Sequence, residues 1–274
     1  MRLALKATCI TTLATLLAAQ AQADTTVNTA TTAPLKTSSA GNINITADGS
    51  IVPTVSGPAV LIDSNNTVTS AGKLTFLGVN DSTAIAANAG VTSTITNSGA
   101  ISNDETYTRT DTNSDTVLDG PYAQGSNRYG IRTAGAFTGN ITNTGAITVR
   151  GNNSAGISLG GPLTGNFSNN GAVTVTGDNT YGIHLGDVTG NVTSAASISM
   201  LGGASPGLVL GNVTGQVVVH GSITTTGYSA TTPPTDLTKL TAQNLEQGGS
   251  AMIVGGNVAG GVLIAAAPAS TTDT

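Results

Sequence analysis

Short stretches of alternating apolar and polar residues recur along the second half of the chain at a fixed period. Successive copies of this pattern open with a glycine, at Gly130, Gly156, Gly182 and Gly207. Alternation with period two, in β-branched residues bounded by glycine and asparagine, is typical of β-strands. A repeat of roughly 20–50 residues is typical of a solenoid, in which each unit is one coil that packs against its neighbours.

Apolar residues that we expect to face the interior occupy three sets of matching positions, which predict three short strands in each coil. The first set is Ile131, Ile157, Leu159, Ile183, Leu185, Leu208 and Leu210; the second is Ile141, Phe167, Val192 and Val217; the third is Ile147, Val149, Val173, Val175, Ile198, Met200 and Ile223. Between the residues of the third set, the side chains of Thr148, Thr174, Ser199 and Thr224 should face outward. The sequence therefore predicts an all-β fold built from stacked coils.

Asparagines also recur, directly after a Thr-Gly corner. They are Asn140, Asn166 and Asn191, with Gln216 at the same place in the fourth coil. Stacked amides can hydrogen-bond from coil to coil, so we expect a ladder here. These asparagines also lie in N-x-S/T sequons, and glycosylation is the alternative interpretation.

The repeat extends in both directions along the chain. We expect about seven coils between Pro58 and residue 265, with loop insertions at about 103–128 and 228–249. Residues 24–57 are less regular and are predicted to cap the first coil. Residues 266–274 read as a truncated tail, from which we expect the chain to be an N-terminal fragment.

The first 23 residues have the features of a Sec signal peptide. A basic start with Arg2 and Lys6 precedes a small, apolar run, and Ala21-Gln22-Ala23 forms a small-x-small cleavage site before Asp24. The only cysteine of the chain lies in this segment. The mature chain is therefore predicted to have no disulfide, thiolate metal site or cysteine nucleophile.

The net charge of the mature chain limits the kinds of binding partner that the protein can have. Removal of the signal peptide leaves seven basic against 14 acidic residues, a net charge of −7. This balance argues against nucleic acid and against anionic lipid as partners. Only 8% of residues are charged, against about 25% in ordinary domains. With regularly spaced apolar positions, so few charges favour an ordered β stack.

Two segments carry the step N-x-G-x-I/V-x-V-x-G, Asn143–Gly151 and Asn169–Gly177. With the Sec signal and the cysteine-free, Gly/Asn/Thr-rich composition, this step resembles the passenger region of bacterial autotransporters, the type V secretion family. The resemblance covers the signal and about residues 58–265. It implies a right-handed parallel β-helix displayed at the outer membrane or released outside the cell. It also implies an outer-membrane β-barrel, expected downstream in the full-length chain.

One acidic stretch has the spacing of a calcium loop. Its oxygen-bearing side chains stand at positions 1, 3, 5 and 9, and they are Asp111, Asn113, Asp115 and Asp119. However, Thr116 replaces the expected glycine at position 6, and Tyr122 replaces the expected acid at position 12. Two interpretations stay open: a Ca²⁺ site, or a solvated acidic loop. No other cofactor is expected.

Catalytic residues are scarce. The two histidines, His184 and His220, lie in coils and are expected at outward or edge positions. Asp178 and Asp187, near Arg150, are the only carboxylates in the coils that could serve a glycosidase or lyase.

We therefore expect no enzyme, but a surface-exposed structural stalk or adhesin. Two alternatives stay open. One is a carbohydrate-active β-helix enzyme. The other is a self-associating or surface-binding solenoid that uses outward threonine rows such as Thr148 and Thr174.

Overall fold

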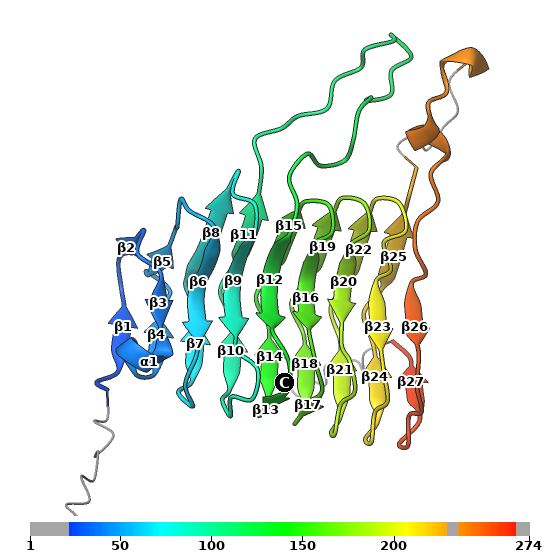
Figure 1. Cartoon of the computed structure of the whole chain (residues 1–274). Coiled ribbons are helices and arrows are strands. Elements are labelled where there is room, and N and C mark those ends of the chain that lie inside the picture. Colours follow the sequence, from blue (N-terminus) through cyan, green and yellow to red (C-terminus); the bar gives the residue numbers. More distant parts are fainter. Residues whose placement is uncertain (1–21, 229–234, 267–274) are drawn as a thin grey trace, which may run out of the picture.

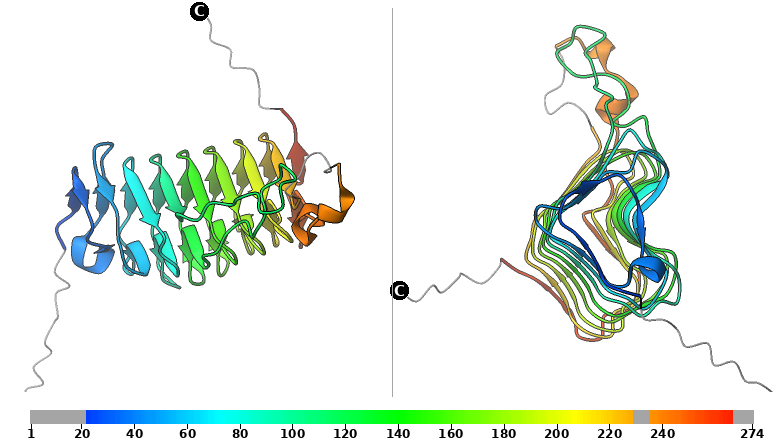
Figure 2. Two further views of the ribbon diagram at one scale, coloured as in Figure 1. Left: turned by 90° about the horizontal axis from the view of Figure 1, so that it is seen from above. Right: turned by 90° about the vertical axis from the view of Figure 1, so that its left-hand side faces the viewer.

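The computed structural model describes residues 22–228 and 235–266, and the predicted signal peptide (1–23) lies almost wholly outside them. The described chain winds through three parallel sheets in turn, and each turn stacks on the one before (Figure 1). Seen end-on, the stacked coils enclose a closed, angular cross-section (Figure 2). This architecture is a parallel β-helix, consistent with the right-handed form that the sequence predicts.

Sheet A has nine strands, and sheets B and C have eight each. Sheet A contains β1 (Thr25–Val27), β4 (Ile43–Ile45), β7 (Val68–Ser70), β10 (Ile95–Asn97), β14 (Ile141–Asn143), β18 (Phe167–Asn169), β21 (Val192–Ser194), β24 (Val217–Val219) and β27 (Val262–Ile264). Sheet B contains β2 (Ala30–Thr31), β5 (Ser50–Ile51), β8 (Lys73–Leu77), β11 (Ile101–Asp104), β15 (Ile147–Arg150), β19 (Val173–Thr176), β22 (Ile198–Leu201) and β25 (Ile223–Thr226). Sheet C contains β3 (Leu35–Lys36), β6 (Gly57–Ile62), β9 (Ser82–Ala87), β12 (Arg128–Thr133), β16 (Ala155–Leu159), β20 (Tyr181–His184), β23 (Leu208–Leu210) and β26 (Met252–Val254). A small two-stranded sheet pairs β13 (Phe137–Thr138) with β17 (Leu163–Thr164).

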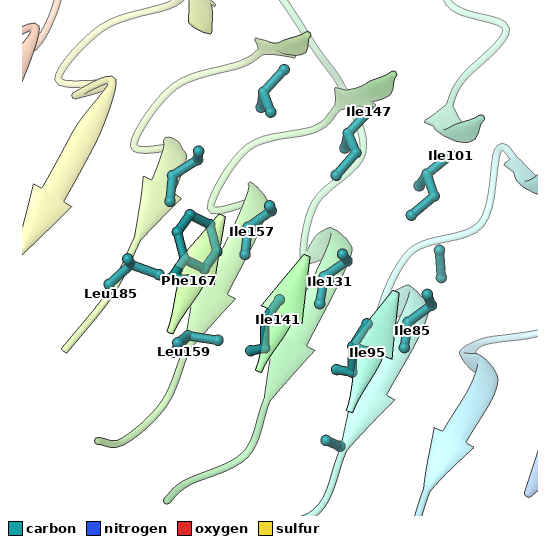
Figure 3. Close-up of a cluster of buried hydrophobic side chains, with 14 of the residues drawn as sticks. Ile85, Ile95, Ile101, Ile131, Ile141, Ile147, Ile157, Leu159, Phe167 and Leu185 are labelled. Atoms are coloured by element: carbon teal, nitrogen blue, oxygen red, sulfur yellow. The ribbon is translucent and has the colours of Figure 1, made fainter. Parts of the chain in front are cut away.

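The strand register confirms the three predicted sets of inward positions. In sheet C, Ile131 pairs with Ile157 and Ile157 with Ile183. In sheet A, Ile141 pairs with Phe167. These side chains are at most 1% exposed and form one continuous core along the stack (Figure 3). Each coil therefore buries its apolar side chains mainly against the equivalent side chains of its neighbours.

The coils begin before Pro58. Strands β1 to β5 of residues 24–57 already belong to the same three sheets. A short helix, α1 (Thr37–Ala40), was not expected. The buried Thr37 hydroxyl donates to Asp63 Oδ1 (3.2 Å) and accepts the Asp63 backbone N–H (3.1 Å), which ties this helix to the next coil.

Helix is scarce elsewhere too. The stretch near Asp236–Glu246 forms two short 3₁₀ turns, η1 (Leu237–Lys239) and η2 (Ala242–Leu245). Among residues 22–228 and 235–266, no helix has the length and apolar character needed to cross a membrane.

The predicted asparagine ladder is present at the surface. Asn140 Oδ1 accepts the backbone N–H of Asn166, Asn166 Oδ1 accepts that of Asn191, and Asn191 Oδ1 accepts that of Gln216, each at 2.9 Å. The bonds run from side chain to backbone, and not from amide to amide as in stacked fibril strands, because each amide oxygen reaches the turn of the adjacent coil.

A second, buried asparagine ladder was not predicted. Asn97 Nδ2 donates to Asn143 Oδ1 (2.7 Å), and Asn143 Nδ2 donates to Asn169 Oδ1 (2.8 Å). Each amide also donates to a backbone carbonyl two residues further on. All three side chains are fully buried, so the ladder satisfies the three amide groups and two of the three amide oxygens inside the core, while Asn97 Oδ1 has no hydrogen-bond partner.

Candidate functional site

Two long segments leave the stack at the same corner, where sheet B leads into sheet C. The first, Glu105–Asn127, joins β11 to β12, and the second joins β25 to β26. Both segments lie where the insertions were expected, and their described residues project together from the coils (Figures 1 and 2). We call residues 105–127 and 235–251 together the crest. It is the main departure from the smooth surface of the stack.

The two parts of the crest contact each other although three strands of sheet B (β15, β19 and β22) lie between β11 and β25, from which they leave the stack. Lys239 Nζ donates to the backbone oxygens of Asn113 (2.8 Å) and Ser114 (3.0 Å). In return, Asn113 Nδ2 donates to the Lys239 backbone oxygen (3.2 Å). Tyr122 is buried, and its hydroxyl donates to the Gly227 oxygen (2.8 Å). The second insertion is thereby held over the first.

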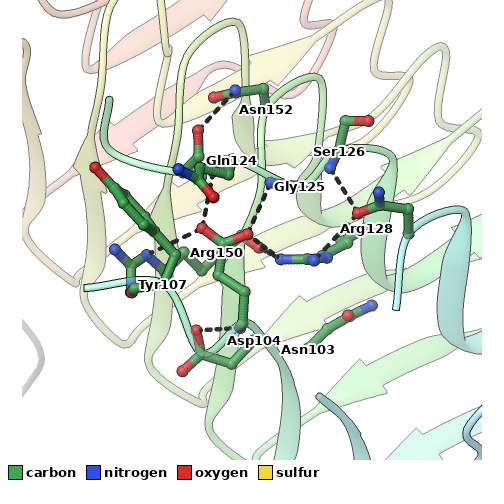
Figure 4. Close-up of polar contacts among 12 residues, drawn as sticks. Asn103, Asp104, Tyr107, Gln124, Gly125, Ser126, Arg128, Arg150 and Asn152 are labelled. Atoms are coloured by element: carbon green, nitrogen blue, oxygen red, sulfur yellow. Dashed lines mark hydrogen bonds and ion pairs between the residues drawn. The ribbon is translucent and has the colours of Figure 1, made fainter. Parts of the chain in front are cut away.

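A buried ion pair fixes the base of the first insertion (Figure 4). The Arg128 side chain is 2% exposed, and its Nη1 lies 2.9 Å from Glu105 Oε2. Glu105 also accepts the backbone N–H groups of Gln124 (2.8 Å) and Gly125 (2.7 Å), so both ends of the loop meet at one carboxylate. Burial alone raises the pKa of Glu105, but these donors outweigh it and hold the pKa below its usual value.

The Arg128 guanidinium is itself fully engaged. It donates to the backbone oxygens of Val79 (3.1 Å) and Arg150 (2.6 Å) and to Asn80 Oδ1 (3.1 Å). We call Glu105, Arg128 and these partners the clasp. Since a buried charge is costly unless it is paired, the clasp couples the conformation of the loop to three successive coils.

Arginine–aromatic contacts brace the stem above the clasp. The Arg150 guanidinium lies 5.5 Å from the Tyr107 ring centre, and the Arg109 guanidinium lies 4.7 Å from that of Tyr122. Arg150 also donates to the backbone oxygens of Tyr107 (2.7 Å) and Tyr122 (3.0 Å). The polar stem is therefore structured by directional contacts and not by an apolar core.

The predicted calcium residues all lie in the tip of the first insertion. Asp111 accepts backbone N–H groups from four residues, 113 to 116, at 2.8–3.3 Å. Asp119 Oδ2 accepts from the backbone N–H (2.8 Å) and hydroxyl (2.7 Å) of Thr112. Desolvation raises the pKa of Asp111, but the backbone N–H donors together outweigh it and hold that pKa below its usual value. The Thr112 donors lower the pKa of Asp119.

Two buried side-chain oxygens of this tip have no hydrogen-bond partner, Asn113 Oδ1 and Asp115 Oδ2. A cleft of about 250 Å³ between the two insertions is lined by Asp115, Asp236, Lys239 and three hydroxyl residues, Ser114, Thr116 and Thr235. Within the described residues, no three His, Cys, Asp or Glu side chains are grouped as a metal site. The Lys239 ammonium already supplies positive charge to this tip.

The carboxylates considered for catalysis lie at different corners. Asp178 follows β19 and accepts the Gly203 backbone N–H (2.9 Å), whereas Asp187 follows β20 and accepts that of Asn212 (2.8 Å). Arg150 is directed to the stem of the crest. Each aspartate thus bonds to the next coil, and the three side chains do not form one groove.

The outward hydroxyl row predicted on sheet B is continuous. In register, Thr75, Ser102, Thr148, Thr174, Ser199 and Thr224 follow one another from β8 to β25. The parallel row two residues further on is interrupted by Arg150 and Leu201. Sheet B therefore presents one unbroken row of hydroxyls.

Comparisons with protein-family models, with curated proteins and with solved structures found no match.

Proposed function

We propose that this chain is a non-catalytic, surface-exposed passenger of the autotransporter type, a stalk or adhesin that presents the crest. The observation that carries the proposal is the unbroken stack of in-register coils, from whose one corner both insertions emerge and dock together. A stack of this kind exposes a long surface and no deep pocket, which suits display and contact. The separate positions of Asp178 and Asp187 also support a non-catalytic role.

The start of the stack agrees with export through a Sec signal. Strand β1 begins at Thr25, one residue after the predicted new terminus Asp24. Asp24 Oδ1 accepts the backbone N–H and the side-chain amide of Asn42, both at 3.0 Å. The proposed mature chain would therefore keep every strand of the stack. Of the cleavage residues, Ala21 lies outside the described residues, whereas Ala23 and Asp24 lie inside them.

Surface display is tested in the producing bacterium. Intact cells are labelled with an antibody against residues 24–274, and the exported protein is sequenced from its N-terminus. We expect surface labelling and Asp24 as the first residue. Retention of Met1, or labelling only after the outer membrane is opened, would refute export and display.

The adhesive role of the crest is tested separately. Residues 108–121 are replaced by a short Gly-Ser linker, which leaves the clasp intact, and circular dichroism verifies the fold. We expect cells bearing this variant to attach less to each other and to surfaces. A Thr142→Ala change on the outer face of sheet A serves as the control. If the crest variant attaches as well as the wild type, the crest is not adhesive and the stalk role alone is supported.

Calcium binding by the tip is part of the proposal. The ion would take the free oxygens Asn113 Oδ1 and Asp115 Oδ2 and would compete with the Lys239 ammonium for backbone oxygens. Calcium should then raise thermal stability by mass action. If calorimetric titration with calcium gives no heat, or if the Asp111→Ala/Asp115→Ala variant responds to calcium like the wild type, the tip is a solvated acidic loop and not a calcium site.

The hydroxyl row on sheet B supports a second candidate, a solenoid that binds a surface or another copy of itself. One hydroxyl per coil, at the strand spacing of about 4.8 Å, gives a regular line along the stack. Thr148→Tyr and Thr174→Tyr would disrupt this line without touching the core. If the two changes leave self-association and surface adsorption unchanged, the second candidate fails.

A further inference from the structure

The outer face of sheet C carries a hollow one coil wide, which has a sequence origin. In β12 the alternation of buried and exposed residues shifts phase at Gly130, so that Tyr129 and Arg132 both face outward. A Cβ at Gly130 would lie 2.5 Å from the oxygen of Gly156 in the next coil, so only glycine fits there.

The same phase shift recurs two coils further on, where Tyr181 and His184 are outward on β20. In register, Tyr129 pairs with Ala155, and Ala155 with Tyr181; likewise Arg132 aligns with Ser158, and Ser158 with His184. The coil between the two tyrosines thus has only small side chains at both positions. Large side chains on either side of small ones leave a groove.

This groove has a volume of about 300 Å³. Its lining residues are Tyr129, Asn153, Ser154, Ser158, Asn179 and Tyr181. None of these side chains is charged at neutral pH. The groove therefore combines two aromatic rings with amides and hydroxyls, and it lies on a different face from the hydroxyl row.

Both aromatic walls are held in place by neighbouring groups. The Arg132 guanidinium lies 4.3 Å from the Tyr129 ring centre, and the Tyr129 hydroxyl donates to the Asn153 backbone oxygen (3.2 Å). The Tyr181 ring packs against the His184 ring, with centres 4.8 Å apart. Such fixed walls reduce the entropy lost when a ligand is bound.

The polar groups of the rim are free to bind a ligand. Asn153 and Asn179 take left-handed backbone conformations, with φ of +50° and +55°, at matching turns of successive coils. In the described part of the chain, neither side-chain amide has a hydrogen-bond partner, in contrast to Asn152, whose Oδ1 accepts the Asp178 N–H. Ser158 Oγ is likewise unpaired. These donors and acceptors therefore stay available beside the tyrosine rings.

We propose that this groove binds a neutral sugar unit, a pyranose ring of a glycan, between Tyr129 and Tyr181. The two tyrosines are two coils apart, about 10 Å along the stack, which leaves room for one ring between them. A pyranose offers apolar C–H faces for the aromatic rings and hydroxyls at its edge for Asn153, Asn179 and Ser158. Pockets that pair aromatic walls with a few convergent polar groups are the usual form of small-ligand sites.

The proposal goes beyond the proposed function, because binding by the purified chain holds whether or not the protein is displayed on cells. The test titrates residues 24–274 with cellohexaose, maltohexaose and mannohexaose, and with an oligogalacturonate of similar length. Binding is followed by saturation-transfer NMR and calorimetry. Tyr181→Ala removes one wall, and Ser158→Tyr fills the hollow. Tyr228→Ala, an exposed tyrosine outside the groove, is the matched control.

We expect saturable binding of at least one neutral oligosaccharide, weakened about tenfold or more by Tyr181→Ala and by Ser158→Tyr. Tyr228→Ala should leave the affinity unchanged. No saturable binding of any neutral oligosaccharide up to about 10 mM would overturn the proposal. So would equal affinity in Tyr181→Ala, provided that this variant keeps the circular dichroism of the wild type. A preference for oligogalacturonate would overturn the assignment to a neutral sugar.

Discussion

The buried asparagine ladder allows a quantitative prediction, because it has an exposed counterpart in the same coil. Asn143→Ala removes three hydrogen bonds: one from Asn97 (2.7 Å), one to Asn169 (2.8 Å) and one to the Gly145 oxygen (2.9 Å). Asn169 Oδ1 and the Gly145 oxygen each lose a donor in the interior. An unsatisfied buried group costs about 1–3 kcal/mol, so we expect a loss of about 3–5 kcal/mol, with a small cavity included.

The matched control is Asn140→Ala, which deletes the same atoms from the surface ladder. Here a single bond is lost, from the Asn166 N–H to Asn140 Oδ1. Asn140 is exposed, so water replaces the acceptor, and the cost should stay below about 1 kcal/mol. The difference between the two variants therefore isolates the effect of burial.

Urea unfolding of residues 24–274, followed by far-UV circular dichroism, measures both variants. Because coils of a solenoid can unfold separately, amide exchange at β14 and β18 should accompany the equilibrium curves. We expect a lower midpoint with an unchanged m-value for Asn143→Ala. If this variant loses no more stability than Asn140→Ala, the ladder does not stabilise the core and the reasoning is wrong.

Further predictions concern the core, the clasp and the crest. Ile157→Asp buries an unpaired charge in a fully buried position and should cost several kcal/mol, seen as loss of β-type circular dichroism; a well-folded variant would contradict the inward assignment. Glu105→Gln should cost about 3 kcal/mol at neutral pH, because Arg128 loses its counter-ion. The lowered pKa of Glu105 means that the wild type loses this stability only as the pH falls below the usual value of 4.5, so thermal melts of the two proteins should converge in acid; a difference that does not depend on pH would refute the clasp. The pKa of Glu246 is raised by burial and by the charge of Asp178, and its buried Oε2 has no hydrogen-bond partner. Glu246→Gln should therefore raise the melting temperature at pH values above this pKa, where the wild-type carboxyl is charged, and should give no gain at lower pH. A lower melting temperature of the variant at neutral pH would contradict this. Lys239→Met should release the second insertion and increase proteolysis there without changing the β signal; unchanged proteolysis would mean that Lys239 does not hold the crest together.

The stack could be predicted from sequence because its determinants repeat. Period-two alternation allows only one inward face per strand, and the fixed repeat aligns Ile141 with Phe167 without further information. The surface ladder followed from recurrence in the same way. The buried ladder gave a similar signal, since Asn97, Asn143 and Asn169 share a register, but asparagine is not expected at an inward position.

The crest could not be predicted because its contacts occur once. Lys239 and Asn113 lie in insertions with no period, and nothing in either segment indicates the other as its partner. Arg128 directly precedes an outward tyrosine, and its burial depends on Glu105 from the far end of the loop. The spacing of the acidic tip suggested cation ligands, whereas in the structure Asp111 accepts backbone N–H groups and Asp119 accepts the backbone N–H and the hydroxyl of Thr112.

The link between Lys239 and Asn113 also has a kinetic consequence. Most contacts in a solenoid join residues about one coil apart, whereas this one joins residues 126 positions apart. The entropy of closing so long a loop is recovered only after the intervening coils have ordered, so the link should form late. A fluorescence donor and acceptor placed on the two insertions would therefore report when the last coils of the β-helix have folded. In the reverse direction, early rupture of this link would precede unwinding from the C-terminal end.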